Sequence, residues 1–525
     1  MNNAEFVREV ANVPPAMPIM VRVDGQKGEE DFNKAVDSIV REFAHLFREQ
    51  GRIHESPQYL MALLIIKWLN DVYRERRTEL AALRPVDSQT VSAGAENDNV
   101  LSFPIAYTGK KIHQALNHVE QAFPDILGGA FAQIDFKESL PGSSEEKAED
   151  FIKNLSNCIS AVRFTLSADS NKEFSTPLKL CRHILSRVDT FTGKNMEGFY
   201  TPVEITDLMA QLVKPTSEES LLDPVCGSGG FLLSAVNYAG SRLNAAPKLI
   251  GFEQNAFARS LTQMSLFLCG ARNGGVFQGS LFSEPPLSPD IKAESIDVIL
   301  TNPPFSQQLP SEIEDELKRK GLLEYKAPRI RFADFAYIQT MLSTLHPDHG
   351  RMLMVVSMGA LFRGGAEQEI RSHLIEGGLI EAVIGLPEKL FYNTAIPVAL
   401  IAFRKNRKDK NILFINATRN FESIKRINIL SHEHVKAIVD AYTRNENIDG
   451  FSRVVELAEV VDNEYDLSPF RYISFVKKTE SIVYLPEILK EKEQLLMAAS
   501  DVERDIGRLL TSLGYSFKEP ENPKE

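Results

Sequence analysis

The sequence predicts an α/β protein built on a doubly wound, mostly parallel sheet, with helical regions before and after it. Three observations predict this fold. Short apolar runs rich in β-branched residues begin near residue 220, helical stretches separate most of them, and strand signals are scarce before residue 200. Runs that are apolar on both faces and alternate with helices are typical of a parallel sheet covered on both sides.

The predicted sheet domain, a Rossmann-like domain, spans residues 190–420. Its predicted strands are SLLDP (220–224), KLIGFEQ (248–254), VFQGS (276–280), SIDVILTNPPF (295–305), RMLMVVS (351–357), LIEAVIGLP (379–387) and VALIAFRK (398–405). NILFINA (411–417) is predicted to add an edge strand.

Both flanking regions are predicted to be helical. Residues 1–185 form the N-terminal helical domain, because apolar residues recur at helical spacing in 30–76, 108–123 and 146–166. Residues 425–525 form the C-terminal helical region, which ends in a coiled-coil-like stripe. The stripe consists of Ile488, Leu495, Ala499, Val502, Ile506, Leu509 and Leu513. It packs either on its own domain or on a partner helix, and the sequence leaves both open.

Composition excludes several classes of protein. The 525-residue chain is 43% hydrophobic and 25% charged, as globular proteins usually are. No apolar run approaches the ~20 residues that span a bilayer, and the first residues lack the pattern of a secretion signal. The four cysteines include no CxxC pair, so no metal site is predicted and a reducing cytoplasm is expected. The net charge of -12 requires that any surface binding nucleic acid be local or come from a partner.

A strand, a glycine-rich turn and a helix follow one another in LLDPVCGSGGFLLSAV (221–236). The strand is predicted to end at Asp223, the turn holds Gly227, Gly229 and Gly230, and the helix begins near Phe231. Such glycines let a ligand approach the backbone, and the amides at the helix start then point at it. A purely structural turn is the alternative.

Glu253 ends the next predicted strand, in LIGFEQN (249–255). An acidic side chain there can accept hydrogen bonds from two ribose hydroxyls, although a lone glutamate at a strand end is often only solvated. Together with the glycine turn, Glu253 predicts a ligand that carries a nucleoside.

The segment Asn302-Pro303-Pro304-Phe305 directly follows the apolar run IDVIL. One interpretation is a turn that ends a strand, since prolines stop strands. The other is chemical. Proline restricts the residue before it, so the Asn302 side-chain oxygen and the Pro303 carbonyl would be two rigid acceptors. An amino group between them would expose its lone pair, while Phe305 stacks on the attached ring.

In this order the segments resemble the amino-methyltransferases that use S-adenosylmethionine. The segment MEGFYTPVEITDLM (196–209) is similar to one that precedes the glycine turn in adenine-specific DNA methyltransferases with the gamma order of motifs. Residues 359–405 and NEYDLSPFRY (463–472) resemble the modification subunit of type I restriction–modification systems. The resemblance covers nearly the whole chain.

The resemblance implies methyl transfer from S-adenosylmethionine to the N6 amino group of adenine in DNA, with the adenine flipped out of the duplex. The implied catalytic residues are Asn302, Pro303, Pro304 and Phe305. The implied cofactor-binding residues are Phe199, Tyr200, Thr201, Pro202, Asp223, Gly227, Ser228, Gly229, Gly230, Phe231, Glu253 and Ser280. Ser280 departs from the family pattern, because many relatives carry an acidic residue there.

The implied partners are double-stranded DNA and a separate specificity subunit that recognises the DNA sequence. A restriction subunit and a second copy of the chain are further candidates, and no membrane is expected. The acidic net charge and the striped terminal helix fit a subunit that depends on a partner. The alternatives are a self-sufficient DNA methyltransferase, a protein glutamine methyltransferase and a non-catalytic assembly protein.

The long connection 306–331 is rich in basic residues near its end. They are Lys318, Arg319, Lys320, Lys326, Arg329 and Arg331. We predict a loop that becomes ordered on DNA phosphates; a solvated helix and loop is the alternative.

Overall fold

The computed structural model describes most of the chain. The described residues are 2–12, 19–24, 28–83, 105–137, 144–166, 175–188, 201–243, 246–282, 294–305, 307–325, 330–391, 396–424, 427–474 and 485–513. The chain divides into two compact units, Met1–Ile473 and Ser474–Glu525, and each is described by itself. Within the described residues, no helix combines the length and the apolar character that crossing a membrane requires.

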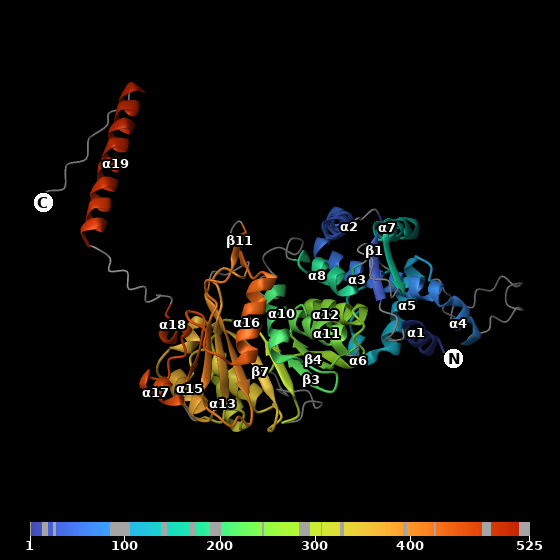
Figure 1. Ribbon diagram of the computed structural model, residues 1–525. Helices are drawn as coiled ribbons and strands as arrows, with labels where there is room; N and C mark the ends of the chain where they lie inside the picture. The colour runs from blue at the N-terminus through green and yellow to red at the C-terminus, as the bar shows by residue number, and fades with distance from the viewer. Residues whose placement is uncertain are drawn as a thin grey trace, which may run out of the picture. The chain divides into compact units, whose positions relative to one another are not determined.

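A large sheet forms the centre of the first unit (Figure 1). Among the described residues it has nine strands. Across the sheet they are β13 (Ser452–Val455), β10 (Ile412–Asn416), β8 (Ile380–Gly385), β9 (Val398–Arg404), β7 (Arg351–Ser357), β6 (Val298–Thr301), β3 (Ser220–Asp223), β4 (Lys248–Glu253) and β5 (Gly274–Gln278). Only β9 and β13 run against their neighbours, so the mostly parallel sheet is confirmed.

Helices cover both faces of this sheet, because its strands are apolar on both sides. Along β3, Leu221 belongs to one apolar cluster and the next residue, Leu222, belongs to another. The first cluster includes α10 (Val203–Val213), α11 (Gly230–Leu243), α12 (Ala256–Leu268) and α16 (His432–Arg444). The second includes α13 (Ser311–Arg319), α14 (Asp334–Leu342), η4 (Met358–Leu361), α15 (Ala366–Glu376) and α17 (Leu457–Asp462). The doubly wound fold is therefore confirmed.

The region before residue 188 is mainly helical, as predicted. Its helices are α1 (Asn3–Ala11), α2 (Glu29–Glu49), η1 (Ile53–Glu55), α3 (Ser56–Glu75), α4 (Arg77–Leu83), α5 (Gly109–Ala122), α6 (Pro124–Leu127), α7 (Glu145–Cys158) and α8 (Pro177–Leu185). The predicted helix over 146–166 is wrong at its end. There β2 (Val162–Leu166) pairs antiparallel with β1 (Ile19–Val23), because Val162 and Phe164 are buried while Arg163 between them is exposed.

An arginine joins this helical region to the sheet region. The Arg272 guanidinium lies 4.2 Å from the ring centroid of Phe267 and 5.2 Å from that of Phe123. It also donates to the Phe267 carbonyl near the end of α12, at 2.7 Å. Cation–π contacts and capping of the last helix carbonyls each stabilise this junction. The helical region and the sheet consequently belong to one compact unit.

The sheet continues beyond the predicted limit at residue 420. Its outermost strand is β13 (Ser452–Val455), so the prediction that β10 (Ile412–Asn416) is an edge strand is wrong. Residues 425–473 also contain β12 (Ile427–Ile429), which pairs antiparallel with β11 (Glu422–Ile424). The helices α16, α17 and α18 (Pro469–Tyr472) lie in the same range. The predicted boundary at 185–190 stays a prediction, because residues 189–200 lie outside the described part.

The described part of the connection 306–331 contains a charged helix, and its ordering on DNA phosphates stays a prediction. Residues Ser311–Arg319 form α13, which buries Glu314 and Leu317. Lys318 pairs with Glu314 at 2.7 Å, so this ion pair joins two successive turns of the same helix. Lys326 and Arg329 lie outside the described residues, while Arg331 is exposed.

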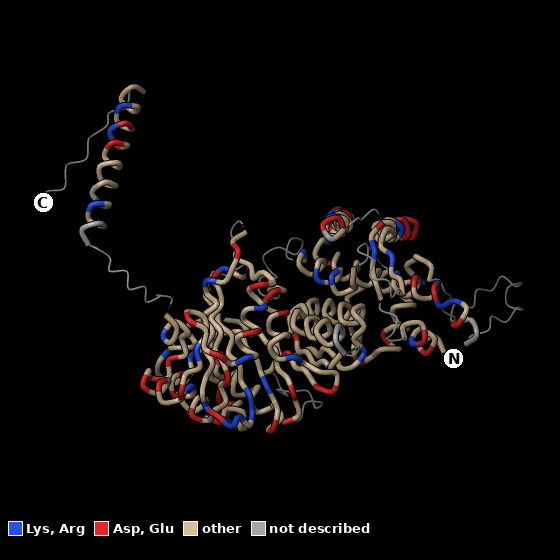
Figure 2. Tube along the Cα trace, in the orientation of Figure 1, with Lys and Arg blue, Asp and Glu red and all other residues tan. Residues whose placement is uncertain are grey.

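The second unit contains α19 (Leu485–Ser512), so the predicted terminal helix is confirmed. Acidic and basic residues both lie in its C-terminal half (Figure 2). Its apolar side chains face solvent: Leu495 is 66% exposed, Val502 58% and Leu509 64%. No described residue of the second unit therefore covers the stripe.

Candidate active site

Three functional segments meet at one edge of the sheet. The strand β3 pairs in parallel with β4 on one side and with β6 on the other. Asp223 ends β3, Glu253 ends β4, and Asn302 follows β6. Carboxyl ends of parallel strands share an edge, and ligands of open α/β sheets bind at that edge. The segments are far apart in the sequence, yet they are neighbours here.

The glycine turn is held to the end of β4 and to α12. The backbone N–H of Gly227 donates to Glu253 Oε2 at 3.0 Å. The Thr262 hydroxyl donates to the Gly227 carbonyl at 2.8 Å. Gly229 has φ +82°, and a Cβ atom there would lie 2.5 Å from Thr262 Cγ2. The turn therefore requires glycine at this position for its backbone and for its packing.

The two carboxyls at this edge differ in their hydrogen bonding. Asp223 is 1% exposed; its Oδ1 accepts from the Val225 N–H at 3.2 Å, while its Oδ2 is buried and has no partner among the described residues. Burial raises the pKa of the Asp223 carboxyl to about 8. Glu253 also accepts from the Asn255 N–H at 2.7 Å, and burial raises the pKa of its carboxyl as well. The Asp223 carboxyl therefore has one oxygen without a hydrogen-bond partner among the described residues.

Asn302 also has an unused acceptor. Its Nδ2 donates to the Thr201 hydroxyl at 3.1 Å. Its Oδ1 is buried and has no partner within the described residues. Pro303 is buried and Pro304 exposed. Phe305 packs edge-on against Phe391, with ring centroids 5.6 Å apart and planes at 90°.

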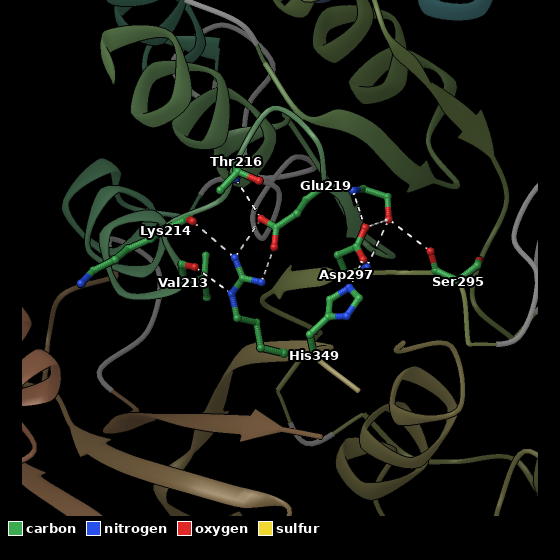
Figure 3. A network of polar contacts seen from close by, with 9 residues as sticks. Val213, Lys214, Thr216, Glu219, Ser295, Asp297 and His349 are labelled. Atoms are coloured by element: carbon green, nitrogen blue, oxygen red, sulfur yellow. Dashed lines mark hydrogen bonds and ion pairs between the residues drawn. The ribbon is translucent and has the colours of Figure 1, made fainter. Parts of the chain in front are cut away.

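The helix α10 runs across the sheet from this edge to the opposite one. Thr201 and the N-cap Pro202 lie at its start, and Val213 is its last residue. At the far edge Arg351 donates to the Val213 carbonyl at 2.8 Å and pairs with Glu219 (Figure 3). Asp297, at the same edge, accepts from Ser220 and His349 (Figure 3). This network fixes the far end of the helix that carries Thr201.

Other predicted site residues occupy different settings. Phe199 and Tyr200 lie outside the described residues. Gly230 is the first residue of α11, and Ser228 precedes it in the turn. Phe231 is 3% exposed and packs in the core, and the Ser280 hydroxyl accepts from the Phe282 N–H at 3.2 Å. Their cofactor roles stay predictions.

Sequence reasoning missed two side chains that support the site. Thr262 supports the glycine turn from the middle of α12, and Phe391 packs on Phe305 from the loop after β8. Thr262 has no local signal, because its role depends on a contact across the fold. Phe391 lies within the segment 359–405 that resembled type I modification subunits, although that resemblance assigned it no role.

The fold is that of a Rossmann-like methyltransferase. The N-6 DNA Methylase family matches residues 181–481, which is more than half of the chain. The chain is 35% identical over 464 residues to the type I restriction enzyme MjaVIII methylase subunit of Methanocaldococcus jannaschii, covering 83% of this chain and 78% of that protein. It is 28% identical to the MjaIX methylase subunit of the same organism, covering 90% of each.

A solved structure agrees with these relatives. The type I restriction–modification system methyltransferase subunit from Streptococcus thermophilus is similar to this chain with a TM-score of 0.66 and 25% identity, covering 84% of this chain and 99% of that one. The chain belongs to the N-6 DNA methylase family, and within it to the methylase subunits of type I restriction enzymes.

Proposed function

We propose that this chain transfers a methyl group from S-adenosylmethionine to the N6 amino group of adenine in DNA, as the modification subunit of a type I complex in the cytoplasm. One observation carries the catalytic part: the Asn302 side-chain oxygen is buried and has no hydrogen-bond partner among the described residues, and Asn302 follows β6, the neighbour of β3. A buried acceptor left unpaired costs about 1–3 kcal/mol. An amino group of the substrate would satisfy it.

The proposed chemistry needs two acceptors at one nitrogen. Asn302 Oδ1 and the Pro303 carbonyl each accept one hydrogen bond from the target amine, so its lone pair turns away from the ring. The positive charge that develops on nitrogen is stabilised by these fixed dipoles. Phe305 stacks on the flipped base and offsets part of the few kcal/mol that flipping costs. The released proton leaves from nitrogen to water.

The turn and the two carboxyls fit the cofactor. When bound, S-adenosylmethionine supplies a methyl group on a positively charged sulfur. We assign its ribose hydroxyls to Glu253 and its amino acid part to the backbone of the segment that begins at Thr201. The unpaired Asp223 Oδ2 is an acceptor that a cationic ligand would complete. The glycine turn lets the ligand approach the backbone.

Cofactor affinity should rise with pH through Asp223. The pKa of this carboxyl, raised by burial to about 8, means that the free protein holds it protonated below that pH. A cationic ligand favours the carboxylate, so binding releases a proton and affinity increases from pH 6.5 to about 8. Isothermal titration calorimetry in buffers of different ionisation enthalpy measures both quantities. Asp223→Asn should bind more weakly and lose the slope; an unchanged slope in this variant would contradict the assignment.

The partner surface is assigned to α19. Its exposed stripe is suited to a helix of the DNA-recognition subunit, and a restriction subunit would join the same complex. Val502→Asp with Leu509→Asp should abolish co-purification with the recognition subunit and leave cofactor affinity unchanged. Met497→Asp is a matched control, because Met497 is 74% exposed but lies off the stripe. Retention of the complex by the double variant would exclude this surface.

Modified-base sequencing of cellular DNA tests the proposed function as a whole. Cells with the gene should carry N6-methyladenine at a sequence in two separated parts, and deletion should remove it. Complementation with Asn302→Ala should fail to restore it. An unchanged methylation pattern after deletion would contradict the proposal, and methylation by the isolated chain would favour the self-sufficient alternative.

A further inference from the structure

We propose that Thr201 is a positioning residue for methyl transfer, which holds the Asn302 amide so that its oxygen faces the target amine. The inference rests on the proposed function and deepens it. It also gives Thr201 a role different from the cofactor contact that the sequence predicts for it. The structure brings this hydroxyl to the catalytic asparagine across a hundred residues of chain.

The two ends of the Asn302 amide differ in their hydrogen bonding. In a primary amide the NH2 group donates and the carbonyl oxygen accepts, and the two groups have nearly the same shape. The target amine must donate, so it can pair only with Oδ1. Asn302 Nδ2 donates to the Thr201 hydroxyl at 3.1 Å, and this bond leaves Oδ1 unpaired within the described residues. If the Asn302 amide were rotated by half a turn, its N–H groups would face the N–H groups of the target amine and oppose its approach.

Thr201 is itself held in place from several directions. It precedes Pro202, the N-cap of α10, whose ring fixes the backbone at the helix start. Further along α10, the Thr206 hydroxyl accepts from Ser234 of α11 at 2.8 Å. Arg182 of α8 pairs with Asp207 at 2.6 Å. A helix fixed in this way can hold a hydroxyl against a neighbouring strand end.

The same residue also lies against the glycine turn. A Cβ atom at Gly230 would lie 3.9 Å from the Thr201 carbonyl oxygen and 3.2 Å from Thr206 Cγ2. The Thr201 backbone therefore lies near the cofactor turn, and its side chain contacts Asn302. Replacing only the hydroxyl separates the two contacts, because valine keeps the shape and the backbone.

The test compares Thr201→Val with Thr201→Ser in the full complex. At saturating cofactor and DNA, the single-turnover rate of Thr201→Val should fall about tenfold, as expected for one neutral hydrogen bond. Thr201→Ser keeps the hydroxyl and should stay within about twofold of the unchanged protein. The cofactor dissociation constant should stay within about twofold in both. Thr165→Val, on β2 of the N-terminal region, makes the same exchange outside the large sheet and should change neither quantity.

Three results would overturn the inference. A single-turnover rate unchanged in Thr201→Val would remove the role of the hydroxyl. Equal loss in the valine and serine variants would assign the effect to shape. Weaker cofactor binding with an unchanged rate at saturation would make Thr201 a cofactor residue. If Thr201→Val fails to fold, Thr201→Ala provides the same comparison with serine. Failure of the unchanged complex to methylate DNA would instead contradict the proposed function.

Discussion

Asn302→Ala is expected to lower the single-turnover rate of methyl transfer by about 10²–10³-fold, while the cofactor dissociation constant changes by less than about twofold. The size of the effect follows from removing one fixed acceptor from the site where charge develops. The cofactor contacts stay because they lie at the ends of β3 and β4 and before α10, whereas Asn302 follows β6. Rapid-quench measurement with labelled cofactor gives the rate, and calorimetry gives the affinity.

The same variant should fold as well as the unchanged protein. Truncation removes an unpaired buried oxygen together with one hydrogen bond, and these contributions oppose each other. Asn416→Ala is the matched control, because Asn416 ends the strand β10 and its Oδ1 accepts from the Thr418 hydroxyl at 2.7 Å. That variant should unfold at lower urea and still transfer methyl groups when folded. Loss of cofactor affinity with transfer preserved in Asn302→Ala would contradict the catalytic role.

Gly229→Ala is expected to have the second largest effect, a loss of cofactor binding of at least about a hundredfold. Its φ of +82° is unfavourable for any residue with a Cβ atom, by about 1–2 kcal/mol. The added methyl group would also overlap Thr262 Cγ2, which lies 2.5 Å from its position. Thr262 then moves away from the Gly227 carbonyl, and the turn loses the shape that receives the cofactor. Calorimetry and urea unfolding measure the two effects separately.

Gly270→Ala separates backbone conformation from packing. Gly270 has φ +86°, nearly the same as Gly229, but its added methyl group would meet nothing within 4 Å. This variant should lose about 1–2 kcal/mol of stability and keep its cofactor affinity. Equal cofactor affinity in the two glycine variants would mean that the turn tolerates a side chain, and the proposed cofactor cradle would be wrong.

Strands of the sheet were predictable where they are apolar on both faces. The run VALIAFRK became β9 (Val398–Arg404), whose residues are nearly all buried. β13 (Ser452–Val455) escaped prediction because an edge strand of four residues needs no long apolar run. β1 and β2 escaped for a related reason, since each buries only some of its side chains. Short strands depend on pairing partners that are distant in the sequence.

Adjacency in the candidate site was predictable from strand ends, whereas its hydrogen bonding was not. Asp223, Glu253 and Asn302 each follow a buried run, so the fold class brings them to one edge. The choice of Thr201 as the partner of Asn302 depends on how α10 crosses the sheet. The support of Gly227 by Thr262 depends on the packing of α12. Neither contact has a sequence signal, because both join residues on separate elements.

The helix α10 connects the candidate active site with the opposite edge of the sheet. A helix of 11 residues is about 16 Å long, and Arg351 fastens its last turn on the side of the sheet opposite the pocket. A rigid rod transmits a small tilt from one end to the other. Loss of the Arg351 contact would therefore change the orientation of the Asn302 amide while the protein is still folded. On heating, the rate of methyl transfer would then fall at a lower temperature than the one at which the protein unfolds.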